Sequence, residues 1–206
     1  ADVIVENTYS TPSWEHAPIE PEAALAYIDT NNQIVIHAPH HHAYVGRDFI
    51  ANMLAIDKEQ VRIIAPPIGG NFGHRGEFIA DGVVALLVSK TKRPVKIVFS
   101  REESILGSAK GESSYHMKYK SGCTKEGKLT AIEAEIITNE GCWRPENYEY
   151  GNQISIHCTG PYSVPNVLVK LYDVCTNMPR SVPIRSVERP ALALSIDSQM
   201  DILAAK

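Results

Sequence analysis

A glycine-rich segment is the part of this sequence best suited to bind an anionic ligand. It holds four glycines between Gly69 and Gly76 and follows a strand-like apolar run at 61–65. Glycines permit positive φ angles and remove the Cβ atoms that keep a ligand away from the backbone. A helix expected at 77–90 would add its positive N-terminal end. The segment therefore predicts a phosphate-binding loop, although a bulky Phe72 at its centre is unusual in one.

Four histidines lie within six residues directly after another strand-like run: His37, His40, His41 and His42. Imidazole is the most common metal ligand, so a zinc, nickel or copper site is one interpretation. Adjacent residues of an extended chain point to opposite sides, however, and no carboxylate or cysteine stands among these histidines. We therefore expect no metal site here. A loop or cleft lining is favoured, with one member contacting a substrate or cofactor as an alternative.

A cationic connection occupies residues 179–190. It contains Arg180, Arg185 and Arg189, with prolines and no helical or strand periodicity. Arginine side chains match the oxygens of phosphate and carboxylate groups in a bidentate manner. The segment is a second candidate anion site. A surface loop whose arginines pair with Glu188 or with water is the alternative.

Helices and hairpins are mixed along the chain rather than arranged as strict β-α-β repeats. Alternating or apolar runs predict strands at 23–28, 33–36, 61–65, 94–99, 114–120, 129–138 and 167–175, and apolar periodicity predicts helices at 47–57, 77–90 and 191–205. We expect an α+β fold with a mixed, largely antiparallel sheet and packed helices.

Composition limits the remaining possibilities. The chain has 206 residues with 44% hydrophobic content, enough for one medium domain or two small ones. A net charge of −4 argues against a nucleic-acid binder, and no run of about 18 apolar residues predicts a membrane span. Four widely spaced cysteines predict reduced, mostly buried thiols in a cytoplasmic protein, with a disulfide pair as the alternative. Both ends of the sequence are abrupt, so we expect a piece of a larger protein.

Taken together, several segments resemble the molybdenum hydroxylases, the superfamily of xanthine dehydrogenase, aldehyde oxidoreductase and carbon monoxide dehydrogenase. The similar segments are collinear along nearly the whole chain, at residues 16–21, 69–75, 93–103, 126–131, 184–186 and 198–201. The resemblance covers only the first molybdopterin-binding half of a longer large subunit. It implies that residues 1–206 form a partial molybdopterin-binding domain with the fold of that family.

The resemblance implies which residues face the cofactor. The family loop reads G-G-G-F-G-G-K-E, so Gly69 and Gly70 match its leading glycines. Phe72 and Gly73 match the Phe-Gly pair whose backbone lies beside the molybdenum centre. Arg185 matches the arginine of the family segment F-R-G-F-G at the cofactor and substrate pocket.

Two departures lie on the cofactor side of the motif. His41 stands where the family has a glutamine hydrogen-bonded to a molybdenum oxygen, and a neutral imidazole N–H could donate the same kind of bond. Asn71 replaces the third loop glycine.

Other departures lie on the substrate side. Gly76 replaces the acidic substrate-facing residue of xanthine dehydrogenases, and Glu77 after it is expected to cap the following helix. Gln153 and Val187 stand where purine-oxidising members carry an arginine and a ring-packing phenylalanine. Xanthine is therefore not the expected substrate.

The activity implied by the resemblance is oxidative hydroxylation of a small heterocycle or aldehyde, with water as the oxygen source. It implies a molybdopterin cofactor, in the cytosine dinucleotide form of bacterial members. It further implies the remainder of the molybdenum-binding subunit and partner domains or subunits carrying iron–sulfur clusters and FAD. The family's catalytic glutamate lies in a G-x-G-E segment that has no match in this sequence. We therefore expect no catalytic residue here and no activity from the isolated chain.

A non-enzymatic alternative remains open. The substitutions at His41, Asn71 and Gly76 are also those expected of a relative that kept the fold as an interaction or chaperone-like module after losing cofactor contacts.

Overall fold

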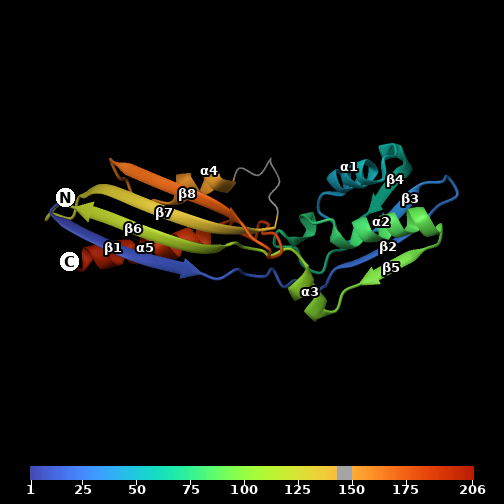
Figure 1. Cartoon of the computed structure of the whole chain (residues 1–206), viewed down its shortest axis with the longest axis horizontal. Helices are drawn as coiled ribbons and strands as arrows, with labels where there is room; N and C mark the ends of the chain where they lie inside the picture. The colour runs from blue at the N-terminus through green and yellow to red at the C-terminus, as the bar shows by residue number, and fades with distance from the viewer. Residues whose placement is uncertain (143–149) are drawn as a thin grey trace. The chain divides into compact units, whose positions relative to one another are not determined.

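The computed structural model describes residues 1–142 and 150–206, which form two compact units (Figure 1). One unit combines residues 1–15 with residues 110–206, and we call it the sheet unit. The other comprises residues 16–109, and we call it the loop unit because it holds the glycine-rich segment.

The loop unit is a four-stranded mixed sheet covered by helices. Its strand order is β4-β3-β2-β5, with β3 and β4 parallel and the other pairs antiparallel. Strand β3, one of the two inner strands, is largely buried, as is typical of a continuous apolar run. The elements are β2 (Ala23–Ile28), β3 (Ile34–His37), α1 (Ala43–Leu54), β4 (Val61–Ile64), α2 (Ile79–Thr91), β5 (Val95–Val98) and α3 (Arg101–Gly107), with short 3-10 turns at Lys58–Gln60 and His74–Gly76.

The core of the loop unit fixes the start and end of the glycine-rich segment. Val84 and Val88, one helical turn apart on α2, are fully buried in the same cluster as Ala26 and Ile36 of the sheet. The segment at 65–78 connects the end of β4 to the start of α2. Both of its ends are therefore anchored in one hydrophobic core.

The sheet unit is an antiparallel sheet extended by one parallel strand. Its order is β1-β6-β7-β8, and only the β7–β8 pair is parallel. Burial alternates along β6, so that Tyr115, Met117 and Tyr119 point into the core that also contains residues of α5. The elements are β1 (Val3–Thr11), β6 (Ser114–Cys123), β7 (Leu129–Gly141), α4 (Tyr150–His157), β8 (Val167–Cys175) and α5 (Arg189–Ala204).

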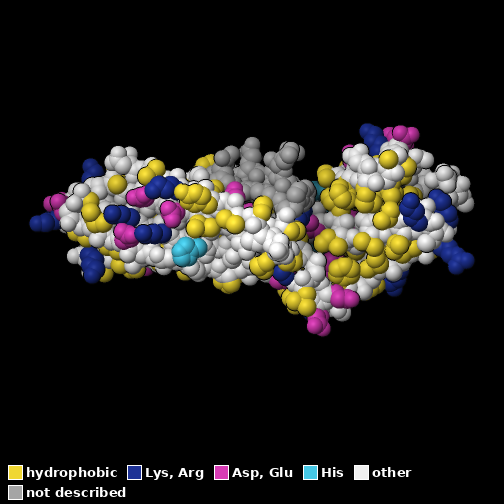
Figure 2. Space-filling model, viewed as in Figure 1, with side chains coloured by type: hydrophobic (Ala, Val, Ile, Leu, Met, Phe, Trp, Pro, Cys, Tyr) yellow, Lys and Arg dark blue, Asp and Glu magenta, His cyan; other side chains and the backbone are white. Residues whose placement is uncertain are grey.

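The opposite face of this sheet carries charged side chains of both signs (Figure 2). Lys118 lies 2.8 Å from Glu6, and Lys170 lies 2.9 Å from Glu133. These exposed pairs contribute little to stability, but they show that this face of the sheet is hydrated.

A buried amide joins α5 to the edge strand β1. Gln199 is fully buried, and its Oε1 accepts hydrogen bonds from Asn7 Nδ2 (2.9 Å) and Tyr9 Oη (2.8 Å). Its Nε2 donates to the carbonyl of Val5 at 3.0 Å. Because β1 and α5 are at opposite ends of the chain, the hydrogen bonds of this amide join the N-terminal strand to the C-terminal helix.

Replacing Gln199 with leucine should lower the free energy of unfolding by roughly 1–3 kcal/mol, because buried polar groups on β1 lose their partners. Urea denaturation measures the change. Leu194→Gln, on an exposed position of the same helix, is the control and should stay within about 0.5 kcal/mol of the parent. Equal effects of both substitutions would contradict the assignment.

The expected α+β fold is confirmed, while several element boundaries were wrong. The strands at 23–28 and 167–175 agree with β2 and β8, but the helix expected at 77–90 begins at Ile79. Phe78 is its N-cap, so Glu77 lies one residue before the cap position and is not the N-cap. The helix expected at 47–57 spans Ala43–Leu54, because Ala55 adopts a left-handed conformation that ends it.

The four cysteines are free, with Cys123 and Cys158 buried and Cys142 and Cys175 exposed. Only two of them are therefore buried, fewer than expected. Burial raises the pKa of the Cys158 thiol. Within the described residues, none of the helices has the length and apolar character needed to cross a membrane.

Candidate functional site

The glycine-rich loop has an unusual backbone at its centre. Phe72 has a φ angle of 56°, between Gly70 at 114° and Gly73 at 108°. Positive φ is normal for glycine, but for a bulky residue it is an outlier that the surrounding structure must maintain. Phe72 is 46% exposed, so burial of the residue does not explain the conformation. The backbone at Phe72 is the feature of this loop that most needs a functional explanation.

Asn71 organises the loop from within. Its Oδ1 accepts hydrogen bonds from the N–H groups of Gly73 and Arg75, both at 3.1 Å, and its carbonyl accepts from the N–H of His74 at 2.9 Å. Asparagine commonly bonds the backbone two residues on in this way. The departure from the family glycine therefore has a clear structural role here.

The leading glycines allow two chain segments to approach closely. A Cβ atom on Gly69 would lie 2.6 Å from Cβ of Glu20, and one on Gly70 would lie 2.9 Å from Cβ of Pro18. The Gly69 N–H donates to Glu20 Oε2 at 2.7 Å, and its carbonyl accepts from the Glu20 N–H at 3.1 Å. In this structure these two glycines accommodate the segment 18–20.

Two arginines, one in the loop and one at the start of α3, hold that segment in place. Arg75 is 3% exposed, and its Nε donates to the carbonyl of Gly70 at 3.1 Å. Its Nη2 donates to the carbonyl of Glu20 and lies 3.6 Å from Glu20 Oε2. Burial lowers the pKa of the Arg75 guanidinium, although the neighbouring carboxylates oppose the shift. Arg101 Nη2 donates to the carbonyls of Pro18 (2.5 Å) and Ile19 (2.9 Å). The Arg75 guanidinium is therefore directed inward and is not placed to bind a phosphate.

The clustered histidines face different partners. His40 is buried, stacks on Phe78 with ring centroids 4.6 Å apart, and has Nε2 2.9 Å from Asp81 Oδ2. His41 is exposed, with Nδ1 3.0 Å from Asn71 Nδ2. The two neighbouring rings therefore point to different surroundings, which is the divergence expected from the sequence.

The hydrogen bonds of Asn71 fix the tautomer of His41. Because Asn71 Oδ1 accepts from two backbone N–H groups, its Nδ2 must face His41 and donate to Nδ1. Partial desolvation lowers the pKa of His41, and the nearby His42 and His40 rings lower it further. A neutral His41 thus carries its proton on Nε2. Gly76 adjoins this edge of the ring, because a Cβ there would lie 3.4 Å from Cε1 and 3.7 Å from Nε2.

Changing Asn71 to aspartate should raise the pKa of His41. A carboxylate would still accept from the Gly73 and Arg75 N–H groups, so the loop would keep its form, but it would favour a protonated imidazole. Titration of the His41 ring by NMR measures the change. Asn31→Asp, at an exposed turn, is the matched control and should leave the His41 pKa unchanged. A His41 pKa that stays low in Asn71→Asp would refute the deduced amide orientation.

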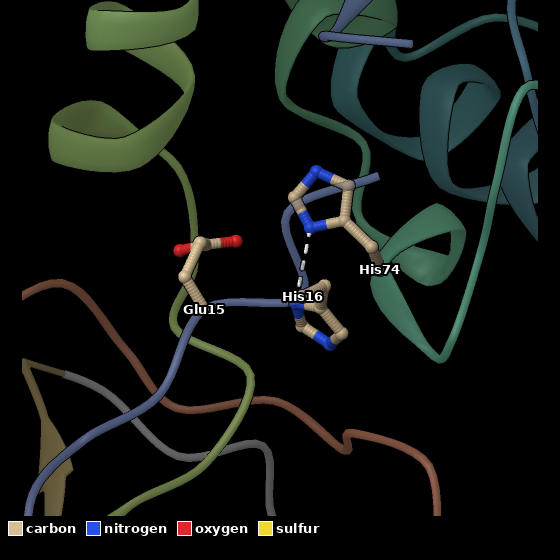
Figure 3. A group of neighbouring side chains, drawn as sticks. All are labelled: Glu15, His16 and His74. Atoms are coloured by element: carbon tan, nitrogen blue, oxygen red, sulfur yellow. Dashed lines mark hydrogen bonds between the residues drawn. The ribbon is translucent and has the colours of Figure 1, made fainter. Parts of the chain in front are cut away.

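A buried chain of polar groups lies under the loop. His74 is 2% exposed, and its Nε2 lies 2.5 Å from Oε1 of Glu22. On the other side of the ring, His74 Nδ1 lies 3.3 Å from Nδ1 of His16, as drawn in Figure 3. Burial acts to raise the pKa of Glu22, but hydrogen bonds from His74 and Ser104 outweigh it and lower the pKa to about 2. This group of buried polar residues was not identified as a site from the sequence.

A small cavity of about 30 Å³ adjoins the same groups, with Glu22, His40, His74, Arg75 and Asp81 among its lining residues. It has room for a water molecule but not for an organic ligand.

The remaining predicted residues belong to the sheet unit. Arg185 is exposed, and the three residues after it, 186–188, have φ angles of 82°, 38° and 57°. Val187 donates its N–H to the carbonyl of Ile184 at 2.8 Å and accepts from the Arg189 N–H at 2.7 Å. Gln153 Oε1 accepts from Arg189 Nη2 at 3.3 Å. Gln153 and Val187 thus share a partner in Arg189, while Gly69, Gly70, Phe72, Gly73, Gly76 and His41 gather in the loop unit.

Comparisons with known proteins agree with this architecture. The model of the molybdopterin cofactor-binding domain family matches residues 1–206. The chain is 36% identical over 203 residues to the nicotinate dehydrogenase large molybdopterin subunit of Eubacterium barkeri. The aligned region covers 98% of this chain and 48% of that subunit. It is 27% identical over 210 residues to the aldehyde oxidoreductase of Megalodesulfovibrio gigas, covering 100% of this chain and 23% of that protein.

A solved structure shows the same fold. The aldehyde oxidoreductase from Desulfovibrio gigas matches with a TM-score of 0.89 and 26% identity, over 100% of this chain and 22% of that one. The chain thus spans about half or less of the length of these relatives. The resemblance identified in the sequence is confirmed: the chain belongs to the molybdopterin cofactor-binding domain family of molybdenum hydroxylase large subunits.

Proposed function

We propose that this chain forms one wall of a molybdopterin pocket in an oxidoreductase that hydroxylates a small heterocycle or aldehyde, with water as the oxygen source. The observation that carries the proposal is the positive φ angle of Phe72, an exposed residue in a loop that the rest of the unit holds in place. Backbone strain of this kind clusters at ligand-binding sites. The activity belongs to the assembled enzyme, because the sequence has no match to the family's G-x-G-E segment with its catalytic glutamate.

Three features of the described residues support such a cofactor, each taken within its own unit. Phe72 and Gly73, at the centre of the loop, match the Phe-Gly pair that lies beside the cofactor in the family. His41 offers a neutral Nε2–H donor in place of the family glutamine. Arg185 is exposed and cationic, suited to the phosphate groups of a pterin dinucleotide. When bound, the cofactor supplies the molybdenum centre at which the substrate is oxidised. The chain's own residues bind and orient it.

The substrate class is suggested by the groups that the pocket residues lack. Gly76, Gln153 and Val187 provide no acidic group, no cationic handle and no aromatic clamp for a purine. Among the relatives, the nicotinate dehydrogenase subunit is named for a pyridine carboxylate. A single-ring nitrogen heterocycle therefore fits better than xanthine.

The rest of the assembly is part of the same proposal. The remainder of the molybdenum-binding subunit supplies the catalytic base, and partner subunits carry iron–sulfur clusters and FAD. The cofactor is proposed in its cytosine dinucleotide form, and the enzyme is proposed to be cytoplasmic. The isolated 206-residue chain is expected to be inactive, and robust hydroxylation by it would contradict this assignment.

Analysis of the complex purified from its native cell tests the proposal. Stoichiometric molybdenum and a pterin that releases cytidine monophosphate on hydrolysis are expected. Hydroxylation of a pyridine-type substrate should incorporate the oxygen of labelled water.

Reversing the charge of Arg185 should lower the pterin content of the assembled complex, because an exposed carboxylate repels the cofactor phosphates. Fluorescence of the oxidised pterin, measured per folded complex, is the readout. Arg62→Glu, at another exposed arginine, is the control and should keep the parental content. An Arg185→Glu complex with full pterin content would remove this arginine from the site.

One observation favours a non-catalytic alternative. The Gly73 N–H, at the position that faces the cofactor in the family, is already hydrogen-bonded to Asn71 Oδ1 at 3.1 Å. A relative that retained only the fold would occur with its partner subunits but without molybdenum or pterin. That result from the native complex would favour an interaction module over an enzyme.

A further inference from the structure

Two buried histidines of the loop unit face each other outside the residues assigned to the cofactor. His16 is 6% exposed and His74 is 2% exposed, and their ring centroids lie 4.9 Å apart with the planes inclined at 56° (Figure 3). The nearest atoms are the two Nδ1 atoms, at 3.3 Å. Ring nitrogens rather than ring faces therefore meet.

The neighbouring carboxylate determines which nitrogen of His74 carries a proton. Glu22 Oε1 lies 2.5 Å from His74 Nε2, and a carboxylate accepts a hydrogen bond only from a protonated nitrogen. A neutral His74 therefore has its proton on Nε2 and its lone pair on Nδ1, directed at His16. A carboxylate behind a histidine is the usual outer partner of a metal-ligating imidazole.

The Nδ1–Nδ1 distance suits a shared metal ion. Zinc–nitrogen bonds are about 2.0–2.1 Å long, so two nitrogens on one tetrahedral zinc ion lie roughly 3.3–3.4 Å apart. The observed 3.3 Å matches that value and exceeds the ~2.9–3.0 Å typical of a hydrogen bond with a nitrogen donor. The lone pair on His74 Nδ1 can face His16 Nδ1 at this distance either across a proton carried by His16 or across a shared cation.

We propose that His16 and His74 bind one first-row transition-metal ion, of the Zn²⁺ class, through their Nδ1 atoms. Glu22 holds the His74 ring in the ligating tautomer from the second nitrogen. The remaining coordination positions are left to water or to a carboxylate. Because the ligands come from residues 16 and 74, this ion ties the segment before β2 to the glycine-rich loop.

Metal titration of the full chain, stripped with a chelator, tests the proposal. One Co²⁺ ion per chain should bind with the visible absorption of a tetrahedral or five-coordinate site, and Zn²⁺ should displace it. Zn²⁺ should also raise the melting temperature, because it binds only the folded chain. Absence of stoichiometric binding would overturn the proposal and leave a proton shared by the two rings.

Three variants locate the ion. His16→Gln should abolish the Co²⁺ absorption and the Zn²⁺-dependent rise in melting temperature. Glu22→Gln should weaken binding by roughly 10- to 100-fold, as loss of an outer partner does elsewhere. His42→Gln is the matched control, because His42 belongs to the other histidine cluster and is exposed. Parental binding by His16→Gln, or loss of binding by His42→Gln, would overturn the assignment.

Circular dichroism of the metal-free variants verifies that each one is folded. The titration needs no molybdopterin, so its outcome is independent of the function proposed for the assembled enzyme.

Discussion

Replacing Gly141 with alanine is expected to lower the free energy of unfolding by about 4 kcal/mol, from left-handed strain and overpacking of roughly 1–3 kcal/mol each. Gly141 ends β7 with a φ angle of 75°. A Cβ there would lie 2.3 Å from the carbonyl oxygen of Pro179 and 2.6 Å from Cα of Arg180. Both are backbone atoms, so no side-chain rotation can relieve the clash. Denaturant unfolding measures the loss.

A substitution at a second glycine, in a turn of the same sheet, measures the cost of backbone strain without the steric clash. Gly127, in the turn between β6 and β7, has a φ angle of 81°, and no atom lies within 4 Å of an added Cβ. Gly127→Ala should therefore cost only the strain, about 1 kcal/mol. Equal losses in the two variants would show that the close approach at Gly141 is not maintained in solution.

The clash created by Gly141→Ala should also affect Arg185, a proposed cofactor-binding residue. Pro179 and Arg180 begin the segment that continues to Arg185. Ser181 donates its N–H to the carbonyl of Glu140 at 3.0 Å, and Thr176 donates to that of Gly141 at 2.8 Å. These bonds hold the start of the segment against the end of β7. Displacing it should reduce cofactor content as well as stability.

Local patterns predicted much of the fold but not its non-local pairings. The run 167–175 is rich in β-branched and aromatic residues and forms β8 with those bounds. Helix α3 was not predicted, although its start carries a local signal in the sequence. Ser100 and Glu103 form a capping box, with Ser100 Oγ accepting from the Glu103 N–H at 3.1 Å and Glu103 Oε2 accepting from the Ser100 N–H at 2.7 Å.

The division into two units could not be read from local patterns. Strand β1 pairs with β6, more than one hundred residues later, so the chain leaves the sheet unit and returns to it. The residues around 15 and 110 carry no local pattern of a boundary between units. The boundary depends on the pairing of β1 with β6, two strands separated in sequence by the whole loop unit.

The candidate site shows the same limit. Phe72 and Gly73 were proposed from the family motif, whereas Asn71 had no role until the fold placed its amide against His41, 30 residues away. His16 and His74 are 58 residues apart, and neither has a local pattern of a ligand. Contacts of this kind depend on the tertiary fold.

Replacing Arg75 with methionine should lower the free energy of unfolding by about 3 kcal/mol, because it leaves partly buried oxygens without their donor and cation. The guanidinium donates to the carbonyls of Gly70 and Glu20 and pairs with the Glu20 carboxylate, so one side chain holds the loop to the segment before β2. Loss of that clamp frees Phe72 to leave its positive φ conformation. The assembled complex should then lose most of its pterin.

Two further variants distinguish the clamp from the charge. Arg75→Lys keeps a cation but has only one nitrogen to serve three acceptors, so it should fall between the parent and Arg75→Met in both stability and pterin content. Arg62→Met removes an exposed arginine and should change stability by no more than about 0.5 kcal/mol. If Arg75→Met kept the parental pterin content despite its lower stability, the loop conformation would not depend on the clamp. The strained backbone at Phe72 would then need another support.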